Sequence, residues 1–229
     1  MLDYMMEIVP TILTSDYQEF SQKINLLKGV VPRVQIDFID GKFVENKTVS
    51  LEAMASLGEL KEIGVDLHLM VKEPADWIAR ALQIFPERII GQVEMMRDAE
   101  NFISGVIEGG AGTGIALDLE TPVSVVSEEI YRSVDLILLL AVKAGFGGQR
   151  FDQRVVKKIE EIKKIVGDLV KVGVDGGLDE ENIKVCQKKG ANIFYVGGNF
   201  WEALNHNGSG QAEDVEKRYN ELLQLISKS

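Results

Sequence analysis

The sequence has little of several features that mark particular classes of protein. Its single cysteine, Cys186, allows no disulfide within the chain, which is typical of a reducing compartment. No apolar run approaches the length of a membrane span, and the opening residues, M-L-D-Y-M-M-E, lack the basic start and apolar core of a signal peptide. We therefore expect a cytoplasmic protein.

Positive charge is also scarce, because 25 Lys and Arg against 36 Asp and Glu give a formal net charge of −11. Nucleic acids and anionic membranes bind cationic surfaces, so we expect no nucleic-acid partner and no membrane partner. An anionic ligand would have to be held by local backbone donors and not by the overall field of the protein. The content of 45% hydrophobic and 27% charged residues is typical of a globular chain.

The chain does contain a regular alternation of short, β-rich apolar runs with longer amphipathic segments. We expect strands at 7–13, 33–39, 65–71, 88–95, 112–119, 135–142, 169–176 and 192–198. Strict alternation implies parallel strands with right-handed crossovers, and eight such units without a linker predict a single (β/α)₈ barrel domain over residues 1–229. An open doubly wound sheet also alternates, but it usually carries a glycine loop after its first strand, where this chain has T-S-D-Y.

Helix start signals stand between these runs. They are Asp16 for the first helix, Pro74 for the third, Thr121 and Pro122 for the fifth, and Asp179 for the seventh. Residues 155–166 have an apolar stripe at the helical period, and residues 212–226 supply an eighth helix after a polar loop at 205–211.

In a barrel of this kind the active site lies at the C-terminal ends of the strands. The polar residues near those ends are Thr11, Gln35, Asp37, His68, Gln92, Glu94, Asp118 and Asp175. Asp37 and His68 come from neighbouring strands and Asp175 from the seventh, so two carboxylates and an imidazole can converge on a divalent metal ion. For Asp118 and Glu94 we expect a structural role and not a place in the metal site, with each side chain capping a neighbouring helix or bonding to backbone N–H groups. His206, in the polar loop, suits a solvated surface position.

Glycine clusters follow the last three strands, at 145–148, 176–177 and 197–198. Glycine lets backbone N–H groups approach an anion closely, and the loops after strands seven and eight are the usual phosphate site of this fold. We therefore expect a phosphate to be held by backbone amides around Gly147, Gly148, Gly176, Gly177, Gly197 and Gly198.

Six stretches together resemble the ribulose-phosphate 3-epimerase family over nearly the whole chain. They are V-P-T-I-L-T-S-D-Y (9–17), I-D-F-I-D-G-K-F-V-E-N (36–46), D-L-H-L-M-V (66–71), A-L-D-L-E-T-P (116–122), G-F-G-G-Q-R-F (145–151) and V-D-G-G (174–177). The resemblance implies a (β/α)₈ barrel that interconverts ribulose 5-phosphate and xylulose 5-phosphate through an enediolate. It also implies a small-molecule sugar phosphate as the bound partner, and we expect a homo-oligomer.

The same resemblance assigns roles to individual residues. Asp37 and Asp175 are the implied acid/base pair, and Asp37, His68 and Asp175 are implied ligands of a divalent cation (zinc, manganese, iron or magnesium). Thr11 and Met70 are implied substrate-binding residues. Inverting a carbon needs one group to remove a proton from one face and another to return it on the other, which two carboxylates can do.

The chain departs from the family pattern mainly around the metal. The positions concerned are Gln35 in place of a histidine ligand, Gln92 in place of a histidine, Ile39 and Leu140 in place of methionines, and Gly173 in place of an acidic or amide residue. An amide oxygen is neutral and a poorer zinc ligand than imidazole, so we expect Gln35 to be a weak ligand and cation binding to be weak, altered or absent. Milder departures are Thr11 and Gly198 in place of serines, and Lys143-Ala144 in place of asparagine–proline.

Several functions are compatible with these departures. The chain can be an epimerase with a weaker or different cation, a paralogue acting on another ketose phosphate, or a sugar-phosphate-binding protein without turnover. Aldol chemistry is a further alternative, and it would need a Schiff-base lysine inside the barrel. Strand parity places Leu138, Leu140 and Val142 inward, so Lys143 falls on the following loop and is poorly placed for this role. Lys171 has inward parity but lies deeper, where it could fill the space left by Gly173.

Overall fold

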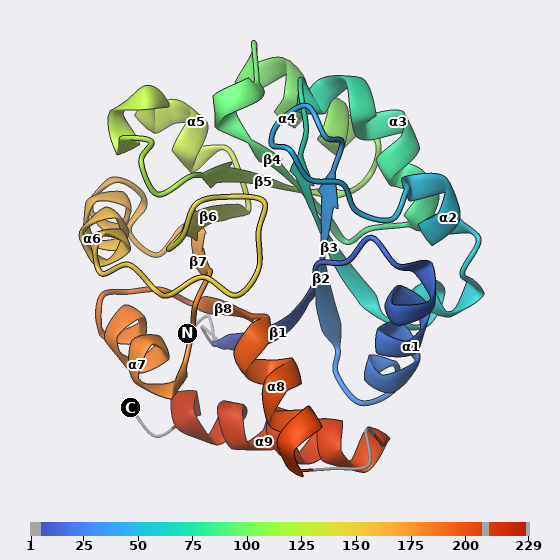
Figure 1. Ribbon diagram of the computed structural model, residues 1–229. Coiled ribbons are helices and arrows are strands. Elements are labelled where there is room, and N and C mark those ends of the chain that lie inside the picture. Colours follow the sequence, from blue (N-terminus) through green and yellow to red (C-terminus); the bar gives the residue numbers. More distant parts are fainter. Residues whose placement is uncertain (1–5, 208–210, 228–229) are drawn as a thin grey trace.

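The computed structural model describes residues 6–207 and 211–227, in which parallel strands close into a barrel in chain order (Figure 1). The strands are β1 (Glu7–Ile12), β2 (Arg33–Ile39), β3 (Gly64–Met70), β4 (Arg88–Gln92), β5 (Gly112–Leu117), β6 (Leu136–Leu140), β7 (Lys171–Asp175) and β8 (Ile193–Val196). The predicted single-domain (β/α)₈ barrel is confirmed. The opening stretch that was compared with a signal peptide includes residues 1–5, which lie outside the described residues.

Helices cover the outside of the barrel (Figure 1). They are α1 (Tyr17–Leu27), α2 (Leu51–Ala55), α3 (Ile78–Ala81), α4 (Ala99–Glu108), α5 (Glu128–Arg132), α6 (Arg154–Val166), α7 (Glu180–Lys188), α8 (Gly198–Asn207) and α9 (Ala212–Ser227). Short 3₁₀ turns are η1 (Gly58–Glu62), η2 (Pro74–Trp77), η3 (Leu82–Ile84), η4 (Val93–Met95) and η5 (Val123–Val125). Within the described ranges, no helix combines the length and apolar character that crossing a bilayer requires.

The predicted helix starts are correct where an aspartate provides the cap. The side chain of Asp16 accepts hydrogen bonds from the backbone N–H groups at the start of α1, and Asp179 does the same for α7. Pro74 stands at the first position of a helical segment as predicted, although that segment is the 3₁₀ turn η2. The start predicted at Thr121 and Pro122 is wrong, because they precede η5.

The true cap of α5 is Ser127, whose hydroxyl accepts a bond from the Ile130 N–H. The predicted fourth strand also ends early. Its last three residues, Val93–Met95, turn away from the sheet as η4.

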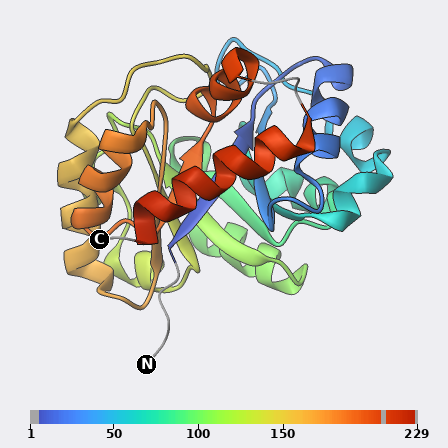
Figure 2. The ribbon, with the colours of Figure 1, turned by 90° about the horizontal axis from the view of Figure 1, so that it is seen from below.

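A helix that the sequence analysis did not predict follows β8. Residues 205–207 of the predicted polar loop belong to the last turn of α8, and residues 208–210 lie outside the described residues. His206 is therefore placed on a helix, and the segment predicted as the eighth helix is α9. In the side view, α8 lies at the end of the barrel where the loops after the strands gather, while α9 runs along the outside (Figure 2).

Strand alternation sorts the apolar side chains into two layers. Outward residues pack against the helices, and a separate inner cluster fills the barrel, including Ile39, Met70, Leu138 and Leu140. The predicted inward parity of Leu138 and Leu140 is thus confirmed.

The space beside Gly173 is filled by Tyr195, since a Cβ built on Gly173 would lie 2.8 Å from the Tyr195 ring. The prediction that Lys171 fills this space is wrong, because Lys171 forms an ion pair with Glu7 at the opposite end of the barrel from the strand-end loops.

A buried ionic cluster closes that opposite end. Asp66 is fully buried and accepts hydrogen bonds from Arg88 Nε (2.9 Å), Arg88 Nη2 (2.7 Å) and the Tyr195 hydroxyl (2.7 Å). Arg33 lies 3.6 Å from the same carboxylate. The cluster can be buried because every charge in it has a partner. It closes this end of the barrel, and its role is structural.

Candidate active site at the C-terminal mouth of the barrel

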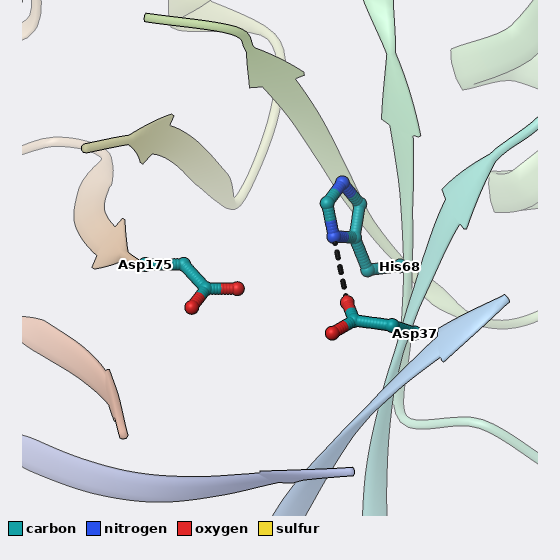
Figure 3. A group of neighbouring side chains, drawn as sticks. All are labelled: Asp37, His68 and Asp175. Atoms are coloured by element: carbon teal, nitrogen blue, oxygen red, sulfur yellow. Dashed lines mark hydrogen bonds and ion pairs between the residues drawn. The ribbon is translucent and has the colours of Figure 1, made fainter. Parts of the chain in front are cut away.

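Asp37 and His68 meet because they are register partners on adjacent strands. The pairing of β2 with β3 sets Asp37 opposite His68, and alternation turns both side chains into the barrel. Asp37 Oδ1 lies 3.0 Å from His68 Nδ1 (Figure 3). The two residues are only 6% and 1% exposed. The neighbours Ile36 and Phe38 point outward into the helix-facing core.

Asp175 faces this pair from the far side of the barrel (Figure 3). It is the last residue of β7, and burial together with the nearby charge of Asp37 raises the pKa of its carboxyl to about 7, although a hydrogen bond from Gln35 opposes the rise. The two carboxylates thus point into one space from opposite walls.

Gln35 connects the two walls from below. This side chain is fully buried on β2, and its Nε2 donates to Asp37 Oδ1 (3.2 Å) and to Asp175 Oδ2 (2.6 Å). Its Oε1 has no hydrogen-bond partner among the described residues. The nitrogen, not the oxygen, is therefore turned toward the carboxylates, and a ligand role would require the amide to turn over.

The residues predicted as metal ligands fit a divalent cation. One potential ligand atom from each of Asp37, His68 and Asp175 lies within 4.8 Å of the others. A set of two carboxylates and one imidazole suits zinc, iron or manganese. His68 Nε2 also has no hydrogen-bond partner within the described ranges, so the ring is not locked into another structural contact.

A cavity of about 940 Å³ opens above the carboxylates. The predicted substrate-binding residues all line it, namely Thr11, Met70, Gly147, Gly148, Gly176, Gly177, Gly197 and Gly198. Asp37, His68 and Asp175 form part of its wall, while Gln35 is covered. A space of this size accommodates a small-molecule ligand.

Backbone conformation or close packing favours glycine at several of these positions, and Gly148 and Gly176 have φ of 72° and 108°. Gly177 has a φ of 62°, and a Cβ there would lie 2.3 Å from the backbone nitrogen of Phe151. A Cβ on Gly197 would lie 2.8 Å from Thr11 Oγ1. Helix α8 begins at Gly198, so its free N–H groups and favourable dipole end lie at the cavity wall.

The other polar strand-end residues do not join the site. Glu94 accepts a hydrogen bond from the backbone N–H of Asp118 (2.7 Å), as expected for residues with a structural role, and neither residue lines the cavity. Gln92 is buried at the end of β4, where turning its amide over lets the nitrogen donate to the Ala116 carbonyl (3.0 Å) and to Glu94 Oε2 (2.7 Å). Lys143 is exposed on the loop after β6, as predicted, and borders the cavity mouth.

Sequence reasoning missed several residues that shape the mouth. Asn46 Nδ2 donates to the carbonyl of Gly145 (2.7 Å), which joins the loop after β2 to the loop after β6. Trp201 Nε1 donates to the Thr11 carbonyl (2.8 Å), and Lys23 lies 4.9 Å from the Trp201 ring centroid. These contacts join segments far apart in the chain, so no local pattern could have revealed them.

The fold and the facing carboxylates define a (β/α)₈-barrel enzyme with its pocket at the C-terminal mouth. Residues 7–201 match the model of the ribulose-phosphate 3 epimerase family, and the chain belongs to this family of isomerases. A ribulose-phosphate 3-epimerase of Bacillus subtilis strain 168 is 30% identical over 84% of this chain and 91% of its own length. The corresponding enzyme of Aquifex aeolicus is 26% identical over 96% of each chain.

Solved structures also resemble the fold as a whole. A mutant tryptophan synthase α-subunit from Pyrococcus furiosus superposes with a TM-score of 0.68 at 16% identity, covering 95% of this chain and 98% of that one. At this identity the likeness concerns only the barrel fold.

Proposed function

We propose that this protein is a ketose-phosphate 3-epimerase that interconverts D-ribulose 5-phosphate and D-xylulose 5-phosphate. The observation that carries the proposal is that Asp37 and Asp175 face each other across one cavity (Figure 3). Family membership and the names of the relatives support the same substrate class.

Inversion at C3 follows from this arrangement. One carboxylate removes the C3 proton from its face of the sugar, which leaves an enediolate, and the other delivers a proton to the opposite face. The roles exchange when the reaction runs backward, so neither residue is only an acid or only a base. Met70 and Leu140 border the cavity and limit the entry of water beside the reacting carbon.

The phosphate would lie at the glycine-rich wall. Backbone N–H groups around Gly147, Gly148, Gly176, Gly177, Gly197 and Gly198 and the start of α8 offer donors there without any buried cation. This agrees with a chain of net charge −11, which cannot attract an anion through its overall field.

Asp37, His68 and Asp175 would hold a divalent cation, with Gln35 as a further ligand only if its amide turned over. Such a cation, when bound, supplies positive charge that stabilises the enediolate. The protein's own residues bind the sugar and transfer the proton. Zinc, manganese, iron and magnesium are the candidates.

A panel of ketose phosphates tests this function. Purified protein is incubated with the 5-phosphates of ribulose and xylulose and with hexulose 6-phosphates, with and without added zinc or manganese, and products are followed by NMR. We expect C3 epimers, with D-ribulose 5-phosphate giving the highest kcat/KM. Tight binding without conversion of any sugar would instead favour the binding protein without turnover, and a lysine adduct trapped by borohydride would favour aldol chemistry.

Two further properties belong to the same proposal. We propose a cytoplasmic protein and a homo-oligomer. Light scattering on the purified protein gives its mass in solution and tests the second of these.

A further inference from the structure

Gln35 occupies a position where it touches both halves of the candidate acid/base pair. It comes two residues before Asp37 on β2 and shares its inward face, so its side chain extends beneath the carboxylates. Asp175 lies 140 positions away in the chain, and Gln35 Nε2 reaches it at 2.6 Å while also lying 3.2 Å from Asp37 Oδ1. One amide group therefore spans the gap between the two carboxylates.

The direction of this amide is set by its surroundings. With the nitrogen toward the carboxylates, both N–H groups have acceptors, and the charged acceptors make these bonds stronger than neutral ones. The reverse orientation would set the amide oxygen against two acceptor groups. Oε1 has no hydrogen-bond donor among the described residues, so the two carboxylates alone set the orientation of the amide.

We propose that Gln35 is a positioning residue whose NH₂ group holds Asp37 and Asp175 together in place of a cation, so that amide and metal compete for the same carboxylates. The proposal deepens the proposed function, because the pair it positions is the acid/base pair of that reaction. Asp37 Oδ1 and Asp175 Oδ2 each accept a charge-assisted hydrogen bond from the amide, so a metal shared by both carboxylates competes with the NH₂ group for these oxygens.

This competition has a consequence for the protein without metal. Two carboxylates facing one another repel, and the amide donor reduces that repulsion. The chain therefore keeps its pair arranged without a cation, and a cation gains less by binding here than at a site whose carboxylates lack a donor.

The test combines zinc affinity with thermal stability on protein stripped of metal by a chelator. Gln35→Leu removes the amide, and Gln35→Glu keeps the shape of the side chain while removing its N–H donors. Gln35→Leu should bind zinc about tenfold more tightly by calorimetry, since the metal no longer displaces an amide, and Gln35→Glu at least as tightly, since its carboxylate is also a zinc ligand. Stripped of metal, both should melt about 5 °C below the wild type, and saturating zinc should close most of that gap.

Gln187→Leu is the matched control. Gln187 is also a buried glutamine whose Nε2 makes two contacts, to Met6 Sδ and to the Ile226 carbonyl, but it lies on α7 away from the site. This variant should lose stability equally with and without zinc and should bind zinc as the wild type does.

Zinc affinity in Gln35→Leu or Gln35→Glu that is equal to or below that of the wild type, including no binding by any of them, overturns the proposal. These readouts do not depend on turnover. A protein that epimerises no sugar but shows the expected zinc and stability changes would refute the proposed function and leave this inference standing.

Discussion

Asp37 and Asp175 line the same cavity, but different contacts hold their side chains in place. Asp37 is buried against His68 on the neighbouring strand, whereas Asp175 ends its strand and is contacted from below by the Gln35 amide. Strand parity was enough to place Gln35 and Asp37 on one face, and strand-end position together with the family resemblance singled out His68 and Asp175. It could not give the direction of the Gln35 amide, because that direction depends on a carboxylate from a distant strand.

At the residue scale, replacing Gln35 by histidine should raise zinc affinity. Gln35→His substitutes an imidazole, a strong zinc ligand, for a neutral amide whose nitrogen faces the carboxylates. We expect at least about a tenfold rise in affinity, together with bound zinc in protein purified without added metal. Metal content by mass spectrometry checks this. Protein without zinc both before and after the change would refute the cation role.

At the scale of elements, the chain shows which local signals are reliable. Asp16 and Asp179 were correctly identified as helix caps, because a short acidic side chain before an apolar stripe has few other uses. Helix α8 was missed because its glycine start was interpreted as a phosphate-binding loop and its polar end as a surface loop. This unpredicted helix contributes to the candidate site, since its first residues form part of the cavity wall.

The loops after β2 and β6 form a second feature at this scale. Asn46 joins them through the Gly145 carbonyl, so we expect Asn46→Ala to loosen the mouth and raise KM about two- to tenfold, with a smaller effect on kcat. Steady-state kinetics on D-ribulose 5-phosphate check this. Asn25→Ala is the matched control, because Asn25 makes the same kind of bond, to the Ser21 carbonyl, within α1. An unchanged KM in Asn46→Ala would show that the bond does not order the mouth.

At the scale of the whole molecule, the two ends of the barrel have different tasks. The C-terminal mouth carries the cavity, and the N-terminal end carries the buried ionic cluster around Asp66. The eightfold alternation was sufficient to predict the barrel. The ionic cluster was not predicted, because charged residues near strand starts usually lie in solvent and only barrel closure brings these together.

Breaking this cluster should destabilise the fold without touching the site. Asp66→Asn leaves Arg88 buried without its charged partner, so we expect the free energy of unfolding to fall by about 3 kcal/mol in urea denaturation. Glu128→Gln, which breaks the exposed pair with Arg132, should change it by less than about 0.5 kcal/mol. Equal losses in the free energy of unfolding from the two variants would contradict a stabilising role for the buried ionic cluster.

The proposed mechanism depends most on two carboxylates acting on opposite faces of one substrate carbon. NMR of D-ribulose 5-phosphate in heavy water follows both epimerisation and deuterium at C3. The wild type should give xylulose 5-phosphate labelled at C3, and Asp37→Asn and Asp175→Asn should each slow epimerisation by about a thousandfold, within the usual range for loss of a general acid or base. Unlabelled product, or wild-type rates in either variant, would contradict the two-carboxylate mechanism.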